Sequence, residues 1–233
     1  MLNQINKDLQ KLKSPEKAKI YARFFKTGKG QYGEGDIFLG LKVPETREIS
    51  KKYINLNFVD IEKLLLSKIH EERLCALLIL VEKYKKSYLG SKKEIIDFYL
   101  KNAKNVNNWD LVDLTADKIL GNYLFNKDKS ILYKLAKSGN LWKRRIAIIS
   151  TFYFIKNKKY DNTFKISEML LNDNHDLIHK AVGWMLREVG KRDEKELCKF
   201  LDKHYKIMPR TMLRYAIERL DRKKKKYYLR KLI

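Results

Sequence analysis

The sequence predicts an all-α fold: an α-solenoid, or superhelix, of HEAT-like helical repeats with a concave basic face. Three observations predict it. Apolar residues recur at helical spacing, only three prolines interrupt 233 residues, and small residues return at a nearly constant interval. Hydrophobic residues make up 44% of the chain, which is enough for a globular core. We expect one domain, 1–233, in which N-terminal helices over 1–54 precede repeats over 55–233.

The N-terminal segment is expected to hold three helices. Residues 1–13 form an amphipathic polar stretch, and Ser14-Pro15-Glu16 places a capping residue before a proline, which is a typical helix start. This second helix is expected to end near Thr27. The third begins at Glu45, after the apolar segment 38–44.

A glycine-rich loop over residues 28–36 holds four of the ten glycines. Such clusters can cradle phosphates, but no strand precedes this one and no Gly-Lys-Ser/Thr sequence ends it, which argues against a P-loop. We interpret it as a flexible loop that could still contact a DNA backbone, and the sequence leaves its role open.

From about residue 55 the chain alternates apolar helices with short polar turns. The second helices of successive pairs are expected over 70–78, 108–120, 142–154, 176–189 and 209–220. Ala147, Ala181 and Ala216 align at intervals of 34 and 35 residues, and Ala76 lies 71 residues before Ala147. Stacked helix pairs of about this period are typical of HEAT-type solenoids, although the usual HEAT repeat has about 40–47 residues.

The charge balance indicates an anionic partner. Lys and Arg number 52 against 28 Asp and Glu, a net charge of +24. Nucleic acid is the usual partner of such a surface, because binding to phosphates releases counterions. The run 219–226, with four consecutive lysines, would add non-specific attraction to DNA or form a solvated helix end. The alternative is an AT-rich genome that raises lysine everywhere, but that bias does not explain where the arginines lie.

The arginines follow the repeat. Arg145, His179 and Arg214 each stand two residues before an aligned alanine, and Arg73 stands three before Ala76. A cation that recurs in this way builds a column along the inner face, where solenoids bind ligands and where a duplex can be held through its phosphates. Solvated charges beside an apolar stripe are the other interpretation.

Several other classes of protein are not indicated. Cys75 and Cys198 have no CxxC or Cys/His companion, so neither a zinc site nor a disulfide framework is expected. No cofactor fingerprint is present, and no cofactor or metal is expected. The N-terminus does not resemble a signal peptide and no apolar run approaches the roughly 18 residues of a membrane span, so we expect a cytoplasmic protein.

The chain offers few groups for chemistry, with scattered histidines and no Ser-His-Asp or HExxH arrangement. One reaction requires few catalytic groups: cleavage of the N-glycosidic bond to a purine alkylated at N3 or N7. Such a base is cationic and leaves as a neutral molecule, so its departure needs no general acid. A carboxylate can stabilise the oxocarbenium sugar and place a water. Aromatic faces stabilise cationic neighbours by roughly 0.5–2 kcal/mol each.

The candidates for this chemistry lie in three helices. Trp109 and Asp113 are spaced i and i+4, which places them on one helix face. Trp184 follows Gly183, which either leaves room for a ligand or packs against another helix. Arg145 follows two other cations. For the acid, local helix hydrogen bonds are the alternative, and for the tryptophans, core packing.

These residues carry a resemblance to a known family. The segments Trp109-Asp110-Leu111-Val112-Asp113, 141–148, 181–188 and 38–44 are similar to bacterial DNA-alkylation-repair glycosylases with HEAT-like repeats, the AlkD-like group. The resemblance runs over most of the chain. It implies excision of positively charged N3- and N7-alkylpurines from duplex DNA by a cofactor-independent hydrolase, in base excision repair, without swinging the base into a pocket.

The resemblance also implies residue roles. Asp113 would be the catalytic carboxylate, Trp109 and Trp184 would pack against the deoxyribose, and Arg145 would hold the backbone. The side chains expected to contact DNA are Arg145, Arg144, Lys143, Arg73, His179, Lys180, Arg187, Arg214 and Phe24. Phe24 stands where the best-known branch has a tyrosine that touches DNA, and Asn108 replaces a second tryptophan.

Two other functions fit the same fold. A non-catalytic DNA-structure-binding protein would keep the basic column without needing the acid or the tryptophans. A protein-interaction scaffold would show an apolar concave face. We expect a monomer that binds double-stranded DNA containing alkylated bases, without a membrane or an obligate protein partner.

Overall fold

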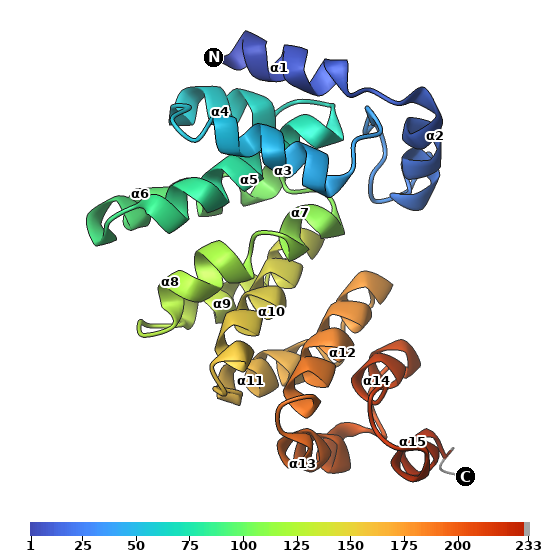
Figure 1. The fold of residues 1–233 in the computed structure, drawn as a ribbon. Coiled ribbons are helices and arrows are strands. Elements are labelled where there is room, and N and C mark those ends of the chain that lie inside the picture. The colour runs from blue at the N-terminus through green and yellow to red at the C-terminus, as the bar shows by residue number, and fades with distance from the viewer. Residues whose placement is uncertain (231–233) are drawn as a thin grey trace. The chain divides into compact units, whose positions relative to one another are not determined.

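The computed structural model describes residues 1–230, apart from the side chain of Leu89, and this part of the chain is helical, as expected (Figure 1). Within it, the only extended pairing is an isolated parallel bridge between Ile37 and Ile69. The chain forms two compact units, which divide between Thr115 and Ala116. The division expected at residue 54 falls inside the first of them. We call the two the N-terminal unit and the C-terminal unit.

The N-terminal unit is built around one buried helix. Its elements are α1 (Leu2–Lys11), α2 (Pro15–Phe24), α3 (Val43–Lys52), α4 (Phe58–Leu65), α5 (His70–Lys86), α6 (Leu89–Lys101), the 3₁₀ turn η1 (Ala103–Asn105) and α7 (Trp109–Asp113). Helices α1, α3, α4, α6 and α7 all contact α5 (Figure 1). Every residue over 74–81 of α5 is buried, as a helix with apolar residues on all sides requires. Burial of each Leu or Ile side chain there contributes about 1.5–3 kcal/mol.

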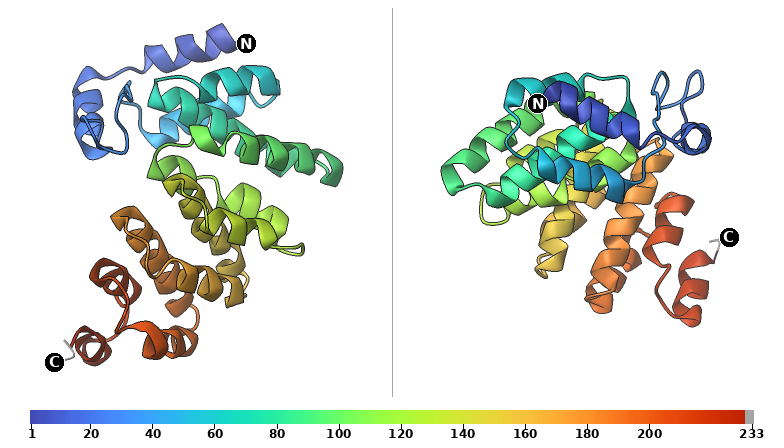
Figure 2. Two further views of the ribbon diagram at one scale, coloured as in Figure 1. Left: turned by 180° about the vertical axis from the view of Figure 1, so that it is seen from behind. Right: turned by 45° about the horizontal axis from the view of Figure 1, so that its top comes forward.

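The C-terminal unit is a succession of further helices. Its elements are the π-helical turn η2 (Asp117–Gly121), α8 (Asn122–Leu124), α9 (Ser130–Ala136), α10 (Leu141–Lys156), α11 (Asp161–Met169), α12 (Asp176–Gly190), α13 (Glu194–His204), α14 (Arg210–Ala216) and α15 (Arg222–Leu229). Helices α10, α12 and α14, coloured from olive to red in Figure 2, pack in succession. The aligned residues Ala147, Ala181 and Ala216 are all at most 1% exposed, so the interval found in the sequence marks the helix contacts.

Two expected helices differ from the structure. The helix expected over 108–120 is split, because α7 ends at Asp113 and η2 begins at Asp117. Thr115 lies in the gap, and its hydroxyl donates to the carbonyl of Leu111 at 2.6 Å, an arrangement that bends helices. The helix expected over 209–220 ends at Ala216. A further helix, α15, then begins in the lysine run, where the Asp221 carboxylate accepts from the Lys224 amide at 2.8 Å.

Gly183 is a packing residue. A Cβ atom added to it would lie 2.5 Å from the Met212 carbonyl oxygen and 2.5 Å from the Cβ of Tyr215. A real Cβ atom does not approach other atoms that closely, so α12 and α14 can pack this way only with glycine at position 183. Of the two interpretations of this residue, helix packing is therefore the one that the structure supports.

Gly183→Ala is accordingly expected to destabilise the C-terminal unit by about 1–3 kcal/mol, because α14 must shift to admit the methyl group. Urea denaturation would measure it. The control is Gly139→Ala, since a Cβ there would meet no atom within 4 Å. Equal stability of the two variants would show that the α12–α14 contact tolerates a side chain.

Candidate functional site

The short helix α7 carries Trp109 at its first residue and Asp113 at its last. A helix of this length gains little from its own hydrogen bonds, so its position depends on anchors outside it. The Asn108 side chain accepts from the Trp109 amide at 2.9 Å, and the side chains of Leu111 and Val112 are fully buried. Trp109 and Asp113 themselves remain partly exposed, so both can reach a ligand at the surface of the N-terminal unit.

An aromatic cluster supports Trp109 from behind. Its ring stacks on Phe25, with centroids 5.2 Å apart and planes at 22°, and Phe25 stacks in turn on Phe38 at 5.1 Å. Phe24 lies edge-on to Trp109 at 5.8 Å and is 60% exposed. Both arrangements are favourable for aromatic pairs. The structure thus brings together Trp109 and Phe24, two residues expected at the site from separate parts of the sequence.

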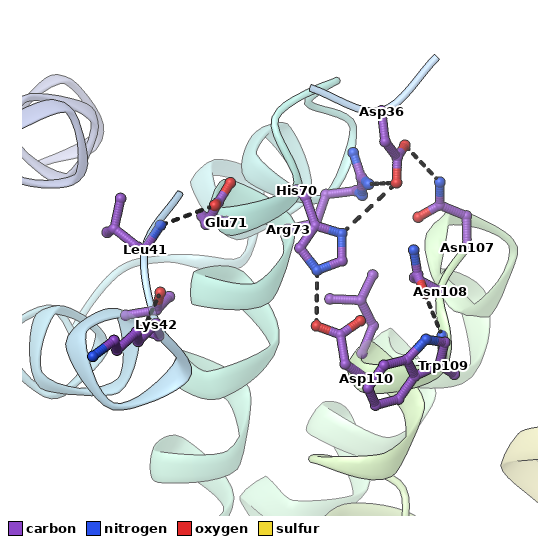
Figure 3. Close-up of polar contacts among 12 residues, drawn as sticks. Asp36, Leu41, Lys42, His70, Glu71, Arg73, Asn107, Asn108, Trp109 and Asp110 are labelled. Atoms are coloured by element: carbon purple, nitrogen blue, oxygen red, sulfur yellow. Dashed lines mark hydrogen bonds and ion pairs between the residues drawn. The ribbon is translucent and has the colours of Figure 1, made fainter. Parts of the chain in front are cut away.

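Next to the start of α7 lies a buried charge cluster of Asp36, His70, Arg73 and Asp110, with the Asn107 side chain at its edge (Figure 3). The His70 Nε2 lies 2.8 Å from Asp110 Oδ2, and its Nδ1 lies 3.7 Å from Asp36 Oδ2. The Arg73 Nη2 lies 2.6 Å from the same Asp36 oxygen. The Asn107 amide donates to Asp36 Oδ1 at 2.8 Å. The cluster therefore joins the end of the glycine-rich loop, the start of α5 and the start of α7.

The surroundings of His70 favour its positively charged form. Burial by itself would lower the pKa of the His70 imidazole, but the carboxylates of Asp110 and Asp36 outweigh it and raise that pKa to about 9. The imidazolium and the Arg73 guanidinium then face two carboxylates, so the cluster is balanced in charge. Buried ions are costly unless they are paired in this way.

Glu71 holds the segment that follows the glycine-rich loop. Glu71 is 1% exposed, and its carboxylate accepts from the amides of Leu39 at 2.9 Å and Gly40 at 2.8 Å. It also accepts from the amide of Leu41 at 3.2 Å (Figure 3). Gly40 has a φ of +92°, and a Cβ there would lie 2.3 Å from the carbonyl oxygen of Ser14. This segment includes Phe38, so Glu71 indirectly supports the aromatic cluster behind Trp109.

In the C-terminal unit, Trp184 is partly exposed on α12. Its ring lies against Phe152 of α10, with centroids 5.9 Å apart. The Lys156 ammonium lies 4.2 Å from the Phe152 centroid and pairs with Asp117 at 2.6 Å. This surface combines aromatic rings with a cation, which suits a sugar or base next to a phosphate.

The expected cation column is not a uniform row of exposed charges. Arg73 is 3% and Arg145 4% exposed, because each guanidinium is engaged by a neighbouring oxygen. For Arg145 that oxygen is the Leu177 carbonyl, which accepts from its Nη1 at 2.5 Å. The His179 Nε2 lies 2.5 Å from the Asp173 carbonyl. The Arg145 contact joins α10 to α12, whereas the Arg73 contact ties α5 to Asp36 of the glycine-rich loop and the His179 contact ties α12 to the turn before it.

The remaining expected cations differ in how far they are paired. Arg144 donates through Nε to Asp173 at 2.6 Å, Lys180 pairs with Asp176 at 2.6 Å, and Arg187 pairs with Glu218. Among residues 1–230, the side chains of Lys143 and Arg214 have no hydrogen-bond or ion-pair partner, and Arg214 is exposed. These two are the most available for a phosphate.

The four residues expected to act on one lesion are divided between the units. Trp109 and Asp113 belong to the N-terminal unit, whereas Arg145 and Trp184 belong to the C-terminal unit. Their meeting on a single ligand stays a prediction.

The sequence analysis missed the buried groups that support α7: His70, Asp110, Asp36 and Glu71. A signal for two of them was present. His70-Glu71-Glu72-Arg73 places four polar or charged residues directly before an apolar run, and all four are buried. Charged residues at the start of a buried helix must find partners, and here the partners come from the loop and from α7.

Two general features complete the description. No helix within residues 1–230 combines the length and the apolar character that crossing a bilayer demands. The same part of the chain contains no group of three or more His, Cys, Asp or Glu side chains arranged to hold a metal ion.

Comparison with known proteins gives one family and several similar folds. The family model described as "DNA alkylation repair enzyme" matches residues 5–220. A predicted DNA alkylation repair enzyme from Enterococcus faecalis has a similar structure, with a TM-score of 0.70, 17% identity, and coverage of 90% of this chain and 97% of that one. AlkD2 from Streptococcus mutans gives a TM-score of 0.55 at 17% identity, covering 94% of this chain and 97% of that one.

A third solved structure, smu.31 from Streptococcus mutans UA159, gives a TM-score of 0.56 at 20% identity over 77% of this chain and 93% of that one. No curated protein matches the chain by sequence. At sequence identities of 17–20%, these structural matches support the helical fold and nothing further.

Proposed function

Because the chain belongs to the DNA alkylation repair enzyme family, we propose that it is a DNA glycosylase that hydrolyses the N-glycosidic bond of positively charged N3- and N7-alkylpurines in duplex DNA. One observation carries the proposal: Trp109 and Asp113 lie partly exposed at the two ends of one short helix that is anchored from behind. This pairs a carboxylate with an aromatic face, the two groups that an oxocarbenium-like sugar requires.

The proposed reaction uses these groups as follows. The bond between C1′ and the purine nitrogen breaks, and its electron pair leaves with the base, which departs neutral. Positive charge develops on the deoxyribose, where the Asp113 carboxylate stabilises it. A water held by the same carboxylate then attacks C1′ and gives up a proton to that carboxylate, which releases it to solvent. Trp109, and Trp184 from the other unit, would pack against the sugar.

We assign the proposed DNA contacts according to whether each side chain already has a hydrogen-bond or ion-pair partner. Lys143, Arg214 and the exposed ring of Phe24 can meet a duplex without losing a partner. Arg144, His179, Lys180 and Arg187 would exchange or share a present partner with phosphate, and for surface ion pairs that exchange costs little. Arg145 can contact phosphate only if DNA reaches a guanidinium that is now covered. Arg73 is placed to stabilise the buried charge cluster.

The test is base release. Purified protein is incubated with duplex DNA methylated to contain 7-methylguanine, and the free base is quantified by chromatography. We expect release well above that of a no-enzyme incubation, without any added cofactor. Release equal to the no-enzyme level would end the glycosylase proposal.

Lys143→Gln is expected to weaken DNA binding and to make the dependence of log Kd on log salt concentration shallower by about 0.9, the change for one lost phosphate contact. Fluorescence anisotropy at several salt concentrations would measure it. Lys159→Gln is the matched control, because Lys159 is exposed beyond the opposite end of α10 and the charge change is the same. If both variants change the slope equally, binding senses only net charge.

A further inference from the structure

We propose that His70 is a positioning residue for the candidate site: its imidazolium holds α7, and with it Trp109 and Asp113, against α5 and the end of the glycine-rich loop. The importance of this role for catalysis rests on the proposed glycosylase function. The placement of α7 does not, and it can be tested separately.

The first link is the contact with Asp110. This carboxylate lies in the first turn of α7, is 4% exposed, and lies 2.8 Å from His70 Nε2 (Figure 3). Residues of a single helical turn move together, so fixing Asp110 fixes the directions in which Trp109 and Asp113 point. Because α7 has only five residues, its own backbone hydrogen bonds cannot supply this constraint.

The second link runs through the aromatic cluster. The His70 ring stacks on Phe38, with centroids 4.5 Å apart and planes at 22°, and contacts Phe25 at 5.2 Å. Phe25 is the ring on which Trp109 stacks. An imidazolium against aromatic faces is favourable as a cation–π contact. His70 therefore contacts both the carboxylate below Trp109 and the ring behind it.

The third link gives the glycine-rich loop a role. Asp36 ends the loop and contacts His70, Arg73 and Asn107, which lies two residues before Trp109. The loop is thus tied to the start of α7 by its last residue.

The charge of His70 decides the strength of these links. The charged groups that face it are Asp110 from α7, Asp36 from the loop, and Arg73 from α5, while Glu71 acts on Arg73. Loss of the His70 proton would leave two carboxylates facing Arg73 alone. Since the carboxylates raise the pKa of His70 from 6.5 to about 9, the link is complete below pH 6.5 and is lost as the pH rises through about 9.

The experiment is ¹⁹F NMR of protein labelled with 5-fluorotryptophan, in which Trp109 reports on α7 while Trp142 and Trp184 report on the other unit. Between pH 7 and 10 we expect the Trp109 resonance to shift with a midpoint near 9, and the other two not to follow. In His70→Gln, which keeps a donor for Asp110 without the charge, this transition should vanish. A Trp109 resonance that does not titrate, or a transition that persists in His70→Gln, would overturn the proposal.

The functional arm is single-turnover release of 7-methylguanine at pH 7. His70→Gln and Asp110→Asn should each lower the rate by roughly tenfold or more, as displaced catalytic groups do, with Kd for DNA within about twofold of wild type. His204→Gln, in the C-terminal unit, is the control and should leave the rate unchanged. A parallel loss of DNA affinity would show a general structural role and contradict positioning. If wild-type protein releases no base, the glycosylase function fails, and the ¹⁹F titration alone decides the placement of α7.

Discussion

Asp113→Asn is expected to reduce single-turnover release of 7-methylguanine by about 10²–10³-fold, the usual effect of removing one group that stabilises transition-state charge. The amide has the same shape as the carboxylate but no negative charge, so it can neither stabilise the cationic sugar nor accept a proton from the water. DNA affinity should stay within about twofold, because a carboxylate does not attract phosphate.

The matched control is Asp97→Asn, which removes an exposed carboxylate from the same unit. Asp97 pairs with Lys93 on the surface of α6, so its loss should change neither release nor binding. Full activity of Asp113→Asn would show that another carboxylate does the chemistry. Intact DNA binding by a wild-type protein that releases no base would favour the non-catalytic DNA-structure binder instead.

Glu71→Gln is expected to lower the free energy of unfolding of the N-terminal unit by about 2–4 kcal/mol. The buried carboxylate accepts from three backbone amides, over 39–41, and an amide side chain would turn its NH₂ group toward at least one of them. A buried backbone donor without an acceptor costs about 1–3 kcal/mol, and loss of the charge weakens the remaining bonds.

Urea denaturation followed by the ¹⁹F resonance of Trp109 would measure this loss in the N-terminal unit alone. Glu48→Gln removes an exposed carboxylate that pairs with Lys51, and it should change the stability by no more than about 0.5 kcal/mol. If Glu71→Gln is as stable as Glu48→Gln, the segment after the glycine-rich loop is held by its apolar contacts and not by the carboxylate.

Helical periodicity and the interval between small residues were sufficient to predict the class of fold. Ala147, Ala181 and Ala216 are buried where successive helices meet, because only a small side chain permits that approach and the requirement recurs with each pair. The family resemblance was also visible in the sequence, since it depends on local motifs such as the one from Trp109 to Asp113.

The split of the helix after Asp113 could not be predicted, because no proline or glycine marks it. The environment of each expected cation could not be predicted from the sequence either. Arg73 and Arg214 both belong to the cation column expected from the sequence, yet Arg73 is buried against Asp36 and Arg214 is exposed. Which charges are available to a phosphate depends on partners that lie far away along the chain.

The sequence by itself determined that this protein is a chain of packed helices and that Trp109 and Asp113 share a helix face, because both properties depend on the spacing of neighbouring residues. Only the tertiary structure decided that His70 lies between the carboxylates of Asp36 and Asp110, residues 34 positions before it and 40 after it. A buried charge is stabilised by the groups that surround it, and the fold alone brings those groups together.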